Sequence, residues 1–143
     1  MRSAAALSGI AILALSHIAS AQVYPHKPIR WIVTYPPGGP TDVVARAVGA
    51  KLTAAWGQQV VIDNRAGAGG VIGSELAAKS VPDGYTLLLG TSAGLSINPV
   101  LSSKLPYDPV RDFVPVSLLV INPQILVANN SLPANTVREL ITL

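Results

Sequence analysis

The chain has 143 residues, of which half are hydrophobic and 12% are charged, a balance that excludes a disordered chain, while its 12 glycines and 12 prolines argue against a helical bundle. The formal net charge is +3 and the basic residues are scattered singly, which excludes a nucleic-acid-binding surface. Cysteine is absent, so disulfides, thiolate metal sites and a cysteine nucleophile are excluded together.

Residues 1–21 have the three parts of a secretory signal peptide. Arg2 supplies a positive charge, residues 4–15 form an apolar run, and Ala19 and Ala21 are the small residues that a signal peptidase reads. The apolar run is too short to span a membrane. We expect cleavage before Gln22 and a soluble mature protein in the periplasm; the alternatives are a buried amino-terminal helix or an uncleaved anchor.

A strand and a helix are predicted next. Residues 29–35 are rich in β-branched and aromatic side chains and stop at the prolines and glycines of 36–40, which predicts a first strand. From Thr41 onward the apolar residues fall at helical spacing, and Thr41 or Asp42 is the expected cap, with Gly57 at the end. The expected apolar stripe is Val44, Val48, Leu52 and Ala55.

The same alternation then repeats. Residues 59–63 predict a second strand, and a glycine-rich loop leads into a helix at 71–80. A tight turn at 82–84 leads into a third, continuously apolar strand at 85–89. Strands that alternate with helices predict an α/β fold, with a parallel sheet flanked by helices.

The pattern is less regular beyond Gly90, because prolines cut the chain into short pieces. Residues 113–121 and 124–128 predict two more strands. Thr136 and Glu139 form a capping box that opens a helix. Only four residues follow Glu139, so we expect the chain to be truncated within an element.

Three glycine-rich junctions each follow a predicted strand, at residues 37–39, 67–70 and 90–94. In a parallel sheet all three lie at the carboxyl edge, where open α/β proteins bind ligands. At least two of them open a helix, whose free backbone N–H groups and positive dipole end favour an anion. The set predicts a site for a small carboxylate or phosphate; the alternative is that the glycines only serve the turns.

Two of these junctions partly match sequence motifs of enzymes. Gly67, Gly69 and Gly73 follow the spacing G-x-G-x-x-x-G, which departs from the dinucleotide-binding pattern, and no P-loop motif occurs. Residues 90–94 match the G-x-S-x-G nucleophile elbow, which leaves an α/β-hydrolase-like esterase using Ser92 as an alternative. Both histidines precede Ser92, and Pro99 interrupts the helix that should follow.

The acidic residues show no metal-ligand spacing, so we expect no metal, no catalytic residue and no cofactor. Among the acidic residues, Asp42 is a candidate for a role in the site, because it lies at the start of the first helix beside the predicted site. It is either a helix cap or a group that meets a ligand hydroxyl or amine. On the second reading, Asp42→Ala weakens binding with little loss of fold.

Five motifs, in order, resemble the Bug family, the receptors of tripartite tricarboxylate transporters. The likeness runs from about Tyr24 to the last residue. The motifs are Tyr24-Pro25-x-Lys27-Pro28-Ile29-Arg30, Pro36-Pro37-Gly38-Gly39-x-Thr41-Asp42, Asp63-Asn64-Arg65-x-Gly67-Ala68-Gly69-Gly70-x-Ile72-Gly73, Pro82-Asp83-Gly84-Tyr85-Thr86-Leu87 and Leu105-Pro106-Tyr107-Asp108-Pro109.

The resemblance implies a two-lobed periplasmic binding protein of the type II topology that captures a small-molecule carboxylate and delivers it to membrane permease subunits. It implies recognition by loop backbone and bridging waters more than by an arginine, and Ser92 as a hydroxyl donor instead of a nucleophile. We further expect a monomer. Carried over by position, the ligand-binding residues are Pro37, Gly38, Gly39, Thr41, Asp42, Ala68, Gly69, Gly70, Thr91 and Ser92.

Members of that family are considerably longer than this chain. The expected organisation is therefore a signal peptide at 1–21, the amino-terminal segment of the first lobe at 22–121, and the truncated start of the second lobe at 122–143. Most of the second lobe is missing on this interpretation. An inert truncated fragment accordingly stands as a third possibility beside the receptor and the esterase.

Overall fold

The computed structural model describes residues 23–123 and 125–143, and its centre is a parallel sheet of three strands. β1 (Ile29–Val33) is the middle strand, between β2 (Val60–Asn64) and β3 (Thr86–Leu89). Both pairings are parallel, as the alternation of strands and helices predicted. The predicted signal peptide lies outside the described residues.

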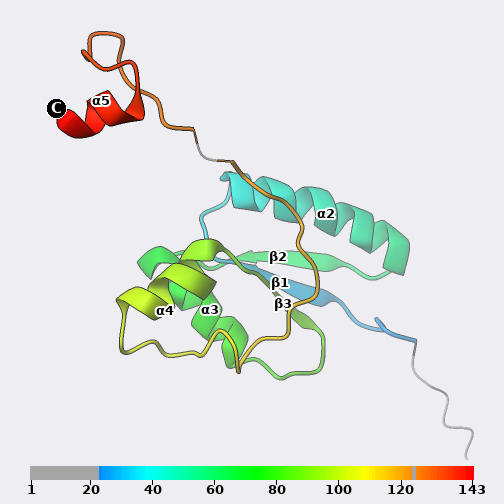
Figure 1. Cartoon of the computed structure of the whole chain (residues 1–143). Coiled ribbons are helices and arrows are strands. Elements are labelled where there is room, and N and C mark those ends of the chain that lie inside the picture. The colour runs from blue at the N-terminus through cyan, green and yellow to red at the C-terminus, as the bar shows by residue number, and fades with distance from the viewer. Residues whose placement is uncertain (1–22, 124) are drawn as a thin grey trace, which may run out of the picture.

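Helices cover both faces of the sheet, because each parallel connection passes through one. α2 (Pro40–Trp56) joins β1 to β2, and α3 (Val71–Ala78) joins β2 to β3. Figure 1 shows α2 on one side of the sheet and α3 on the other. This layered arrangement confirms the predicted α/β class.

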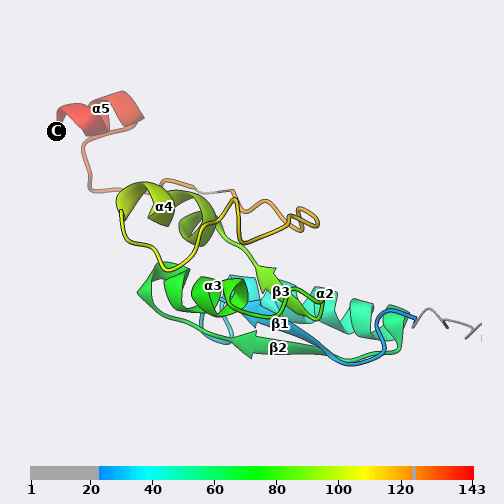
Figure 2. The ribbon, with the colours of Figure 1, turned by 90° about the horizontal axis from the view of Figure 1, so that it is seen from below.

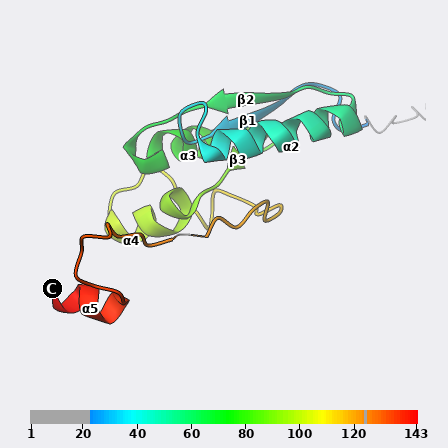
Figure 3. The same cartoon turned by 90° about the horizontal axis from the view of Figure 1, so that it is seen from above.

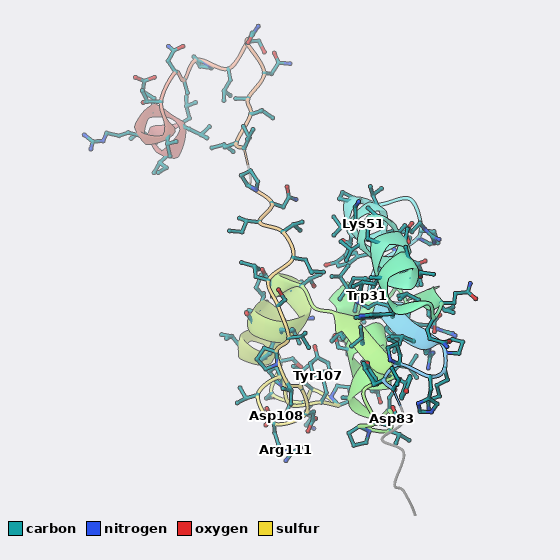
Figure 4. The ribbon with its side chains drawn as sticks, turned by 90° about the vertical axis from the view of Figure 1, so that its right-hand side faces the viewer. Trp31, Lys51, Asp83, Tyr107, Asp108 and Arg111 are labelled. Carbon is teal, nitrogen blue, oxygen red and sulfur yellow. The ribbon has the colours of Figure 1, made fainter. Side chains whose placement is uncertain are left out.

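The main core lies between the sheet and α2. Successive side chains of a strand point to opposite faces, so Ile29, Trp31 and Val33 point to the same face, and all three are buried there with Ala45 of α2. Figure 4 shows Trp31 on β1, close to α2. The helix stripe was predicted only in part, because Val48 and Leu52 pack against this core whereas Ala55 is exposed.

The ends of α2 confirm one sequence prediction and correct another. Gly57 ends the helix in the left-handed conformation, and its N–H donates to Thr53 O, as expected. The predicted capping by Thr41 or Asp42 is wrong, because the N-cap is Gly39 and no side chain caps the helix. Pro40 occupies the first turn, where its fixed φ favours the helix and its missing N–H costs nothing.

α3 lies very close to the end of β1 because it carries a glycine at the crossing. A Cβ atom added to Gly73 would lie 2.8 Å from Arg65 O and 2.9 Å from Thr34 Cγ2. Such distances are closer than carbon atoms pack. The glycine therefore sets the depth at which α3 sits on the sheet.

Beyond β3 the chain turns through two short helices, η2 (Ala93–Ile97) and α4 (Asn98–Leu101). The sequence treated Pro99 as an interruption, but Pro99 lies in the first turn of α4, where proline is tolerated. No helix in the described part of the chain is long and apolar enough to cross a membrane.

The two strands predicted at 113–121 and 124–128 are not formed, so that prediction is wrong for the residues that the structure describes. Val114, Val116 and Leu118 are exposed, and no strand lies beside the segment in the described ranges. A β-branched composition favours a strand only when a partner supplies hydrogen bonds and packing. Gln124 lies outside the described residues.

The last helix, α5 (Val137–Thr142), confirms the predicted capping box in its main feature. Thr136 Oγ1 accepts the N–H of Glu139 at 3.2 Å, and the Glu139 carboxylate accepts the N–H of Asn135 at 2.7 Å. The helix lies apart from the sheet in every view (Figures 1 and 3).

Candidate functional site

The three predicted junctions follow β1, β2 and β3, so they lie at the carboxyl edge of the parallel sheet. Figure 2 shows the strand arrowheads pointing to the side of the molecule that carries α4. α2 and α3 both begin at this edge, each on a glycine N-cap without a side-chain hydrogen bond. No side chain covers their first N–H groups, but Pro40 has none and the N–H of Val71 donates to Ala68 O.

The first junction is held in place by Asp42. Its carboxylate accepts hydrogen bonds from the backbone N–H of Gly38 at 2.9 Å, from Arg46 Nε at 2.8 Å and from Asn64 Nδ2 at 3.0 Å. The Asn64 amide also donates to Tyr35 O at 3.0 Å. Asp42 thereby ties the loop after β1 to the end of β2.

The environment of Asp42 keeps its carboxylate ionised. The hydrogen bond from Arg46 and then the backbone N–H of Gly38 lower the pKa of Asp42 to about 2. Its side chain is buried, with the residue 3% exposed, and three groups already donate to its two oxygens. Asp42 is thus positioned to shape the loop and does not cap the helix, and its contact with a ligand stays a prediction.

The second junction is a tight turn built on left-handed residues. Gly69 and Gly70 have φ values of +63° and +94°, and Ala68 adopts +48°, which is uncommon for a residue with a side chain. The short helix η1 (Ala68–Gly70) leads directly into α3. Gly69 O accepts a hydrogen bond from Asn98 Nδ2 at 3.1 Å, which links this turn to α4.

A buried tyrosine holds the third junction in place through a hydrogen bond. Tyr107 is 6% exposed, and its hydroxyl donates to Gly94 O. Figure 4 shows Tyr107 on the side of its segment that faces the sheet. Thr91 Oγ1 lies 3.4 Å from the N–H of Gly94, and Ser92 is exposed at the start of η2.

The structure brings the second and third junctions into contact. A Cβ atom added to Gly70 would lie 4.0 Å from Gly94 Cα, so the two backbones meet directly. The first junction is tied through Asp42 and Asn64 to the end of β2, and no hydrogen bond within the described ranges joins it directly to Thr91 or Ser92.

The ten predicted ligand-binding residues differ in their access to solvent. Two are buried, Asp42 and Gly70, while Gly39, Thr41 and Thr91 are half-buried. The remaining five are exposed: Pro37, Gly38, Ala68, Gly69 and Ser92. What the edge offers to a ligand is chiefly backbone N–H groups of two helix starts and the hydroxyls of Thr91 and Ser92, a set of donors suited to an anion.

Two hollows among the described residues lie away from the ten predicted residues. One hollow of about 310 Å³ lies between the end of α3 and Phe113, and another of about 590 Å³ lies around Tyr107 and Asp108. Neither hollow is lined by any of the ten.

The sequence missed four residues that shape the site: Thr34, Arg46, Asn64 and Asn98. Arg46 follows Asp42 by one helical turn, a spacing from which their pairing is readable. Asn64 ends β2, so its position at the carboxyl edge was also readable. Thr34 and Asn98 gave no signal, because their contacts depend on how α3 and α4 pack.

No histidine of the described residues lies at this edge, where an esterase that uses Ser92 would need one. His26, the histidine among the described residues, lies near the opposite end of β3, where its Nδ1 is 2.7 Å from the hydroxyl of Tyr85. Ser92 follows the other end of that strand. Within residues 23–123 and 125–143 no group of three or more acidic or histidine side chains is placed to hold a metal ion.

Known proteins match this chain over most of its length. A family model described as tripartite tricarboxylate transporter family receptor matches residues 44–143. Protein BugT of Bordetella pertussis is 47% identical over 133 residues, which cover 92% of this chain and 41% of that protein. The chain thus spans less than half the length of this relative.

Solved structures agree with the sequence match. A protein from R. palustris with adipate is 37% identical, with a TM-score of 0.73, over 83% of this chain and 40% of its own. MatC from Rhodopseudomonas palustris with bound malate is 38% identical, with a TM-score of 0.64, over 67% of this chain and 33% of its own. The fold is accordingly part of a periplasmic binding protein fold, as the resemblance implied.

Proposed function

The chain belongs to the tripartite tricarboxylate transporter receptor family, and we propose that it supplies the carboxylate-binding loops of an extracytoplasmic receptor for small organic acids. The receptor is exported by the signal peptide at 1–21, acts in the periplasm and passes its ligand to membrane permease subunits. Residues 22–121 belong to its first lobe and residues 122–143 begin the second.

The observation that carries this proposal is the shared edge of the sheet. Two helices begin there on glycines without side-chain caps, and the turns around Gly70 and Gly94 touch. A helix start concentrates partial positive charge and unpaired N–H groups, which stabilise a carboxylate. The named ligands of the two solved relatives, adipate and malate, are both small dicarboxylates.

The charged side chains near the edge support recognition by the backbone. Arg46 and Arg65 are the nearby cations in sequence, and each guanidinium is paired with a carboxylate of this chain, Asp42 or Asp63, at 2.8 Å. Each charge is thus balanced by a carboxylate of this chain, although both arginine side chains are more than half exposed. The exposed hydroxyl of Ser92 and the N–H groups of the helix starts are therefore the donors that we assign to the ligand.

The same arrangement argues for a binding role over an esterase. An activated serine needs a base within hydrogen-bond reach, and His26 is engaged with Tyr85 at the other edge of the sheet. The family to which the chain belongs is one of binding proteins. We therefore propose that Ser92 binds and does not attack.

The test is a ligand screen by thermal shift on the protein as its gene encodes it. The panel contains dicarboxylates such as adipate and malate, tricarboxylates, acidic amino acids and aromatic acids, with the diamide of adipic acid as the uncharged control. We expect one class of carboxylate to raise the melting temperature while the diamide has no effect. A flat response to every carboxylate would overturn the proposal.

Two exposed serines, Ser92 at the start of η2 and Ser96 within it, give a matched pair of variants. Ser92→Ala removes the proposed donor and is expected to weaken carboxylate binding by about tenfold, the worth of one hydrogen bond to a charged group. Ser96→Ala changes an equally exposed serine of η2 and is expected to leave the affinity unchanged. Hydrolysis of a p-nitrophenyl ester that disappears in Ser92→Ala would favour the esterase instead.

A further inference from the structure

A polar group lies unpaired beneath the candidate site. Thr34 directly follows β1 and is 2% exposed, and its hydroxyl has no hydrogen-bond partner among the described residues. It is the only buried side-chain nitrogen or oxygen of the described residues in that condition. Such a group costs free energy in the empty protein, because burial removes its water without replacing it.

The residue type makes this unusual. Thr34 ends a strand whose neighbours Ile32 and Val33 are both fully buried and apolar. Valine has nearly the same shape as threonine and would fill this position without an unpaired hydroxyl. Packing alone therefore does not explain why this residue is a threonine and not a valine.

The surroundings of the hydroxyl are the site itself. A Cβ atom added to Gly70, the N-cap of α3, would lie 3.4 Å from Thr34 Oγ1 and 4.0 Å from Gly94 Cα. Thr34 Oγ1 is thus beneath the point where the second and third junctions touch. Both neighbours are glycines, so neither contributes a side chain between the hydroxyl and the edge.

The other side of Thr34 is closed. Its methyl group faces α3 at Gly73, where an added Cβ would lie 2.9 Å from Thr34 Cγ2. The methyl group therefore fills the contact with the helix, while the Cβ and the hydroxyl of Thr34 both lie 3.4 Å from a Cβ added to Gly70. The methyl group is thus accounted for by packing, whereas the hydroxyl has no partner among the described residues.

We propose that the Thr34 hydroxyl is a specificity-determining group of the binding site, which donates a hydrogen bond to the innermost oxygen at the start of α3. That oxygen belongs either to the bound carboxylate or to one water beneath it. In both cases the hydroxyl gains a partner that the described residues do not supply. The inference rests on the proposed carboxylate binding, which it deepens.

The test compares Thr34→Val with Thr34→Ser and Thr86→Val in the protein as its gene encodes it. Titration calorimetry measures affinity for the carboxylate that gives the largest thermal shift, and melting is recorded without ligand. Thr34→Val is expected to bind at least about tenfold more weakly, since one hydrogen bond to a charged oxygen is lost. Its melting temperature without ligand is expected to be unchanged or higher, since a valine leaves no unpaired hydroxyl.

The controls separate the hydroxyl from its shape and its residue type. Thr34→Ser keeps the hydroxyl and is expected to retain affinity within about threefold, at a lower melting temperature because the methyl contact with α3 is lost. Thr86→Val changes a half-buried threonine at the far end of β3 and is expected to bind as the unchanged protein does.

The outcomes distinguish this inference from the proposed function. If the unchanged protein binds a carboxylate and Thr34→Val binds it equally well, the role of the hydroxyl is refuted and the receptor function stands. If the unchanged protein binds no carboxylate, both fail. A structure of the complex then decides between ligand and water, because a direct contact places a carboxylate oxygen within about 3 Å of Thr34 Oγ1.

Discussion

The carboxylate of Asp42 and the backbone N–H of Gly38 are 2.9 Å apart, and this bond fixes the loop that precedes α2 from inside the fold. Gly38 adopts a left-handed φ of +83°, so the bond holds the loop in a conformation that few residue types share. The orientation of the neighbouring N–H groups therefore depends on a side chain that is itself buried.

Asp42→Asn is expected to weaken carboxylate binding and lower the melting temperature together. The sequence alone predicted that removing Asp42 would leave the fold almost intact, but the side chain accepts three hydrogen bonds in a buried position. We expect a loss of roughly 5 °C by calorimetry. Lys51→Ala, on the exposed part of α2, is the control; an unchanged melting temperature in Asp42→Asn would contradict the proposed tether.

Lowering the pH should remove the contribution of Asp42 to the free energy of unfolding within a defined window. Its pKa is lowered from 3.8 to about 2, chiefly by the hydrogen bond from Arg46, so ionised Asp42 stabilises the folded chain at pH values above 3.8. That stabilisation falls progressively as the pH drops from 3.8 toward 2. Urea unfolding at a series of pH values should show the difference between the unchanged protein and Asp42→Asn shrinking across this window; a constant difference would count against it.

Gly73→Ala should be destabilising where Gly39→Ala is tolerated. A Cβ at position 73 meets the backbone oxygen of Arg65 at 2.8 Å, whereas one at position 39 has its nearest neighbour, Pro36 O, at 3.6 Å. Overpacking of this kind costs about 1–3 kcal/mol. Chemical denaturation measures both variants, and equal stabilities would show that α3 moves away from β1 without cost.

Tyr107→Phe should loosen the third junction without unfolding the sheet. The variant keeps the buried ring and its edge-on contact with Phe113, but removes the hydrogen bond to Gly94 O. We expect a loss of about 1 kcal/mol and faster amide exchange in residues 93–97 than in β1. Exchange measured by mass spectrometry checks this, with Phe113→Leu as the companion that spares the hydroxyl; uniform acceleration throughout the chain would refute a local role.

The elements around the main sheet were readable because local chemistry and tertiary context agree there. The strand at 29–35, the helix that Gly57 ends and the turn before β3 all carry their own start or stop signals. Residues 113–121 carry the composition of a strand but no partner in the described chain, and composition cannot supply a partner. The effect of Pro99 was predicted wrongly, because a proline breaks a helix from inside but is tolerated in its first turn, where Pro99 lies.

The candidate site was predictable at the level of loops and not of side chains. Glycines after strands marked the three junctions, since parallel topology places all strand ends at one edge. The hydrogen bonds of Asp42 were not predicted, because its partner Asn64 becomes a neighbour only after β2 pairs with β1. Whether the ten predicted residues contact a ligand stays a prediction, which the titrations above address.

The central position of β1 has a consequence for the order of folding. Its amide groups bond forward to partners that are synthesised much later, as Ile29 N–H to Gln59 O and Arg30 N–H to Tyr85 O show. A chain that emerges amino end first exposes its most buried strand long before either neighbour arrives. We therefore expect β1 to stay unpaired until β2 has been made, and the three-stranded sheet to be complete only after β3 follows.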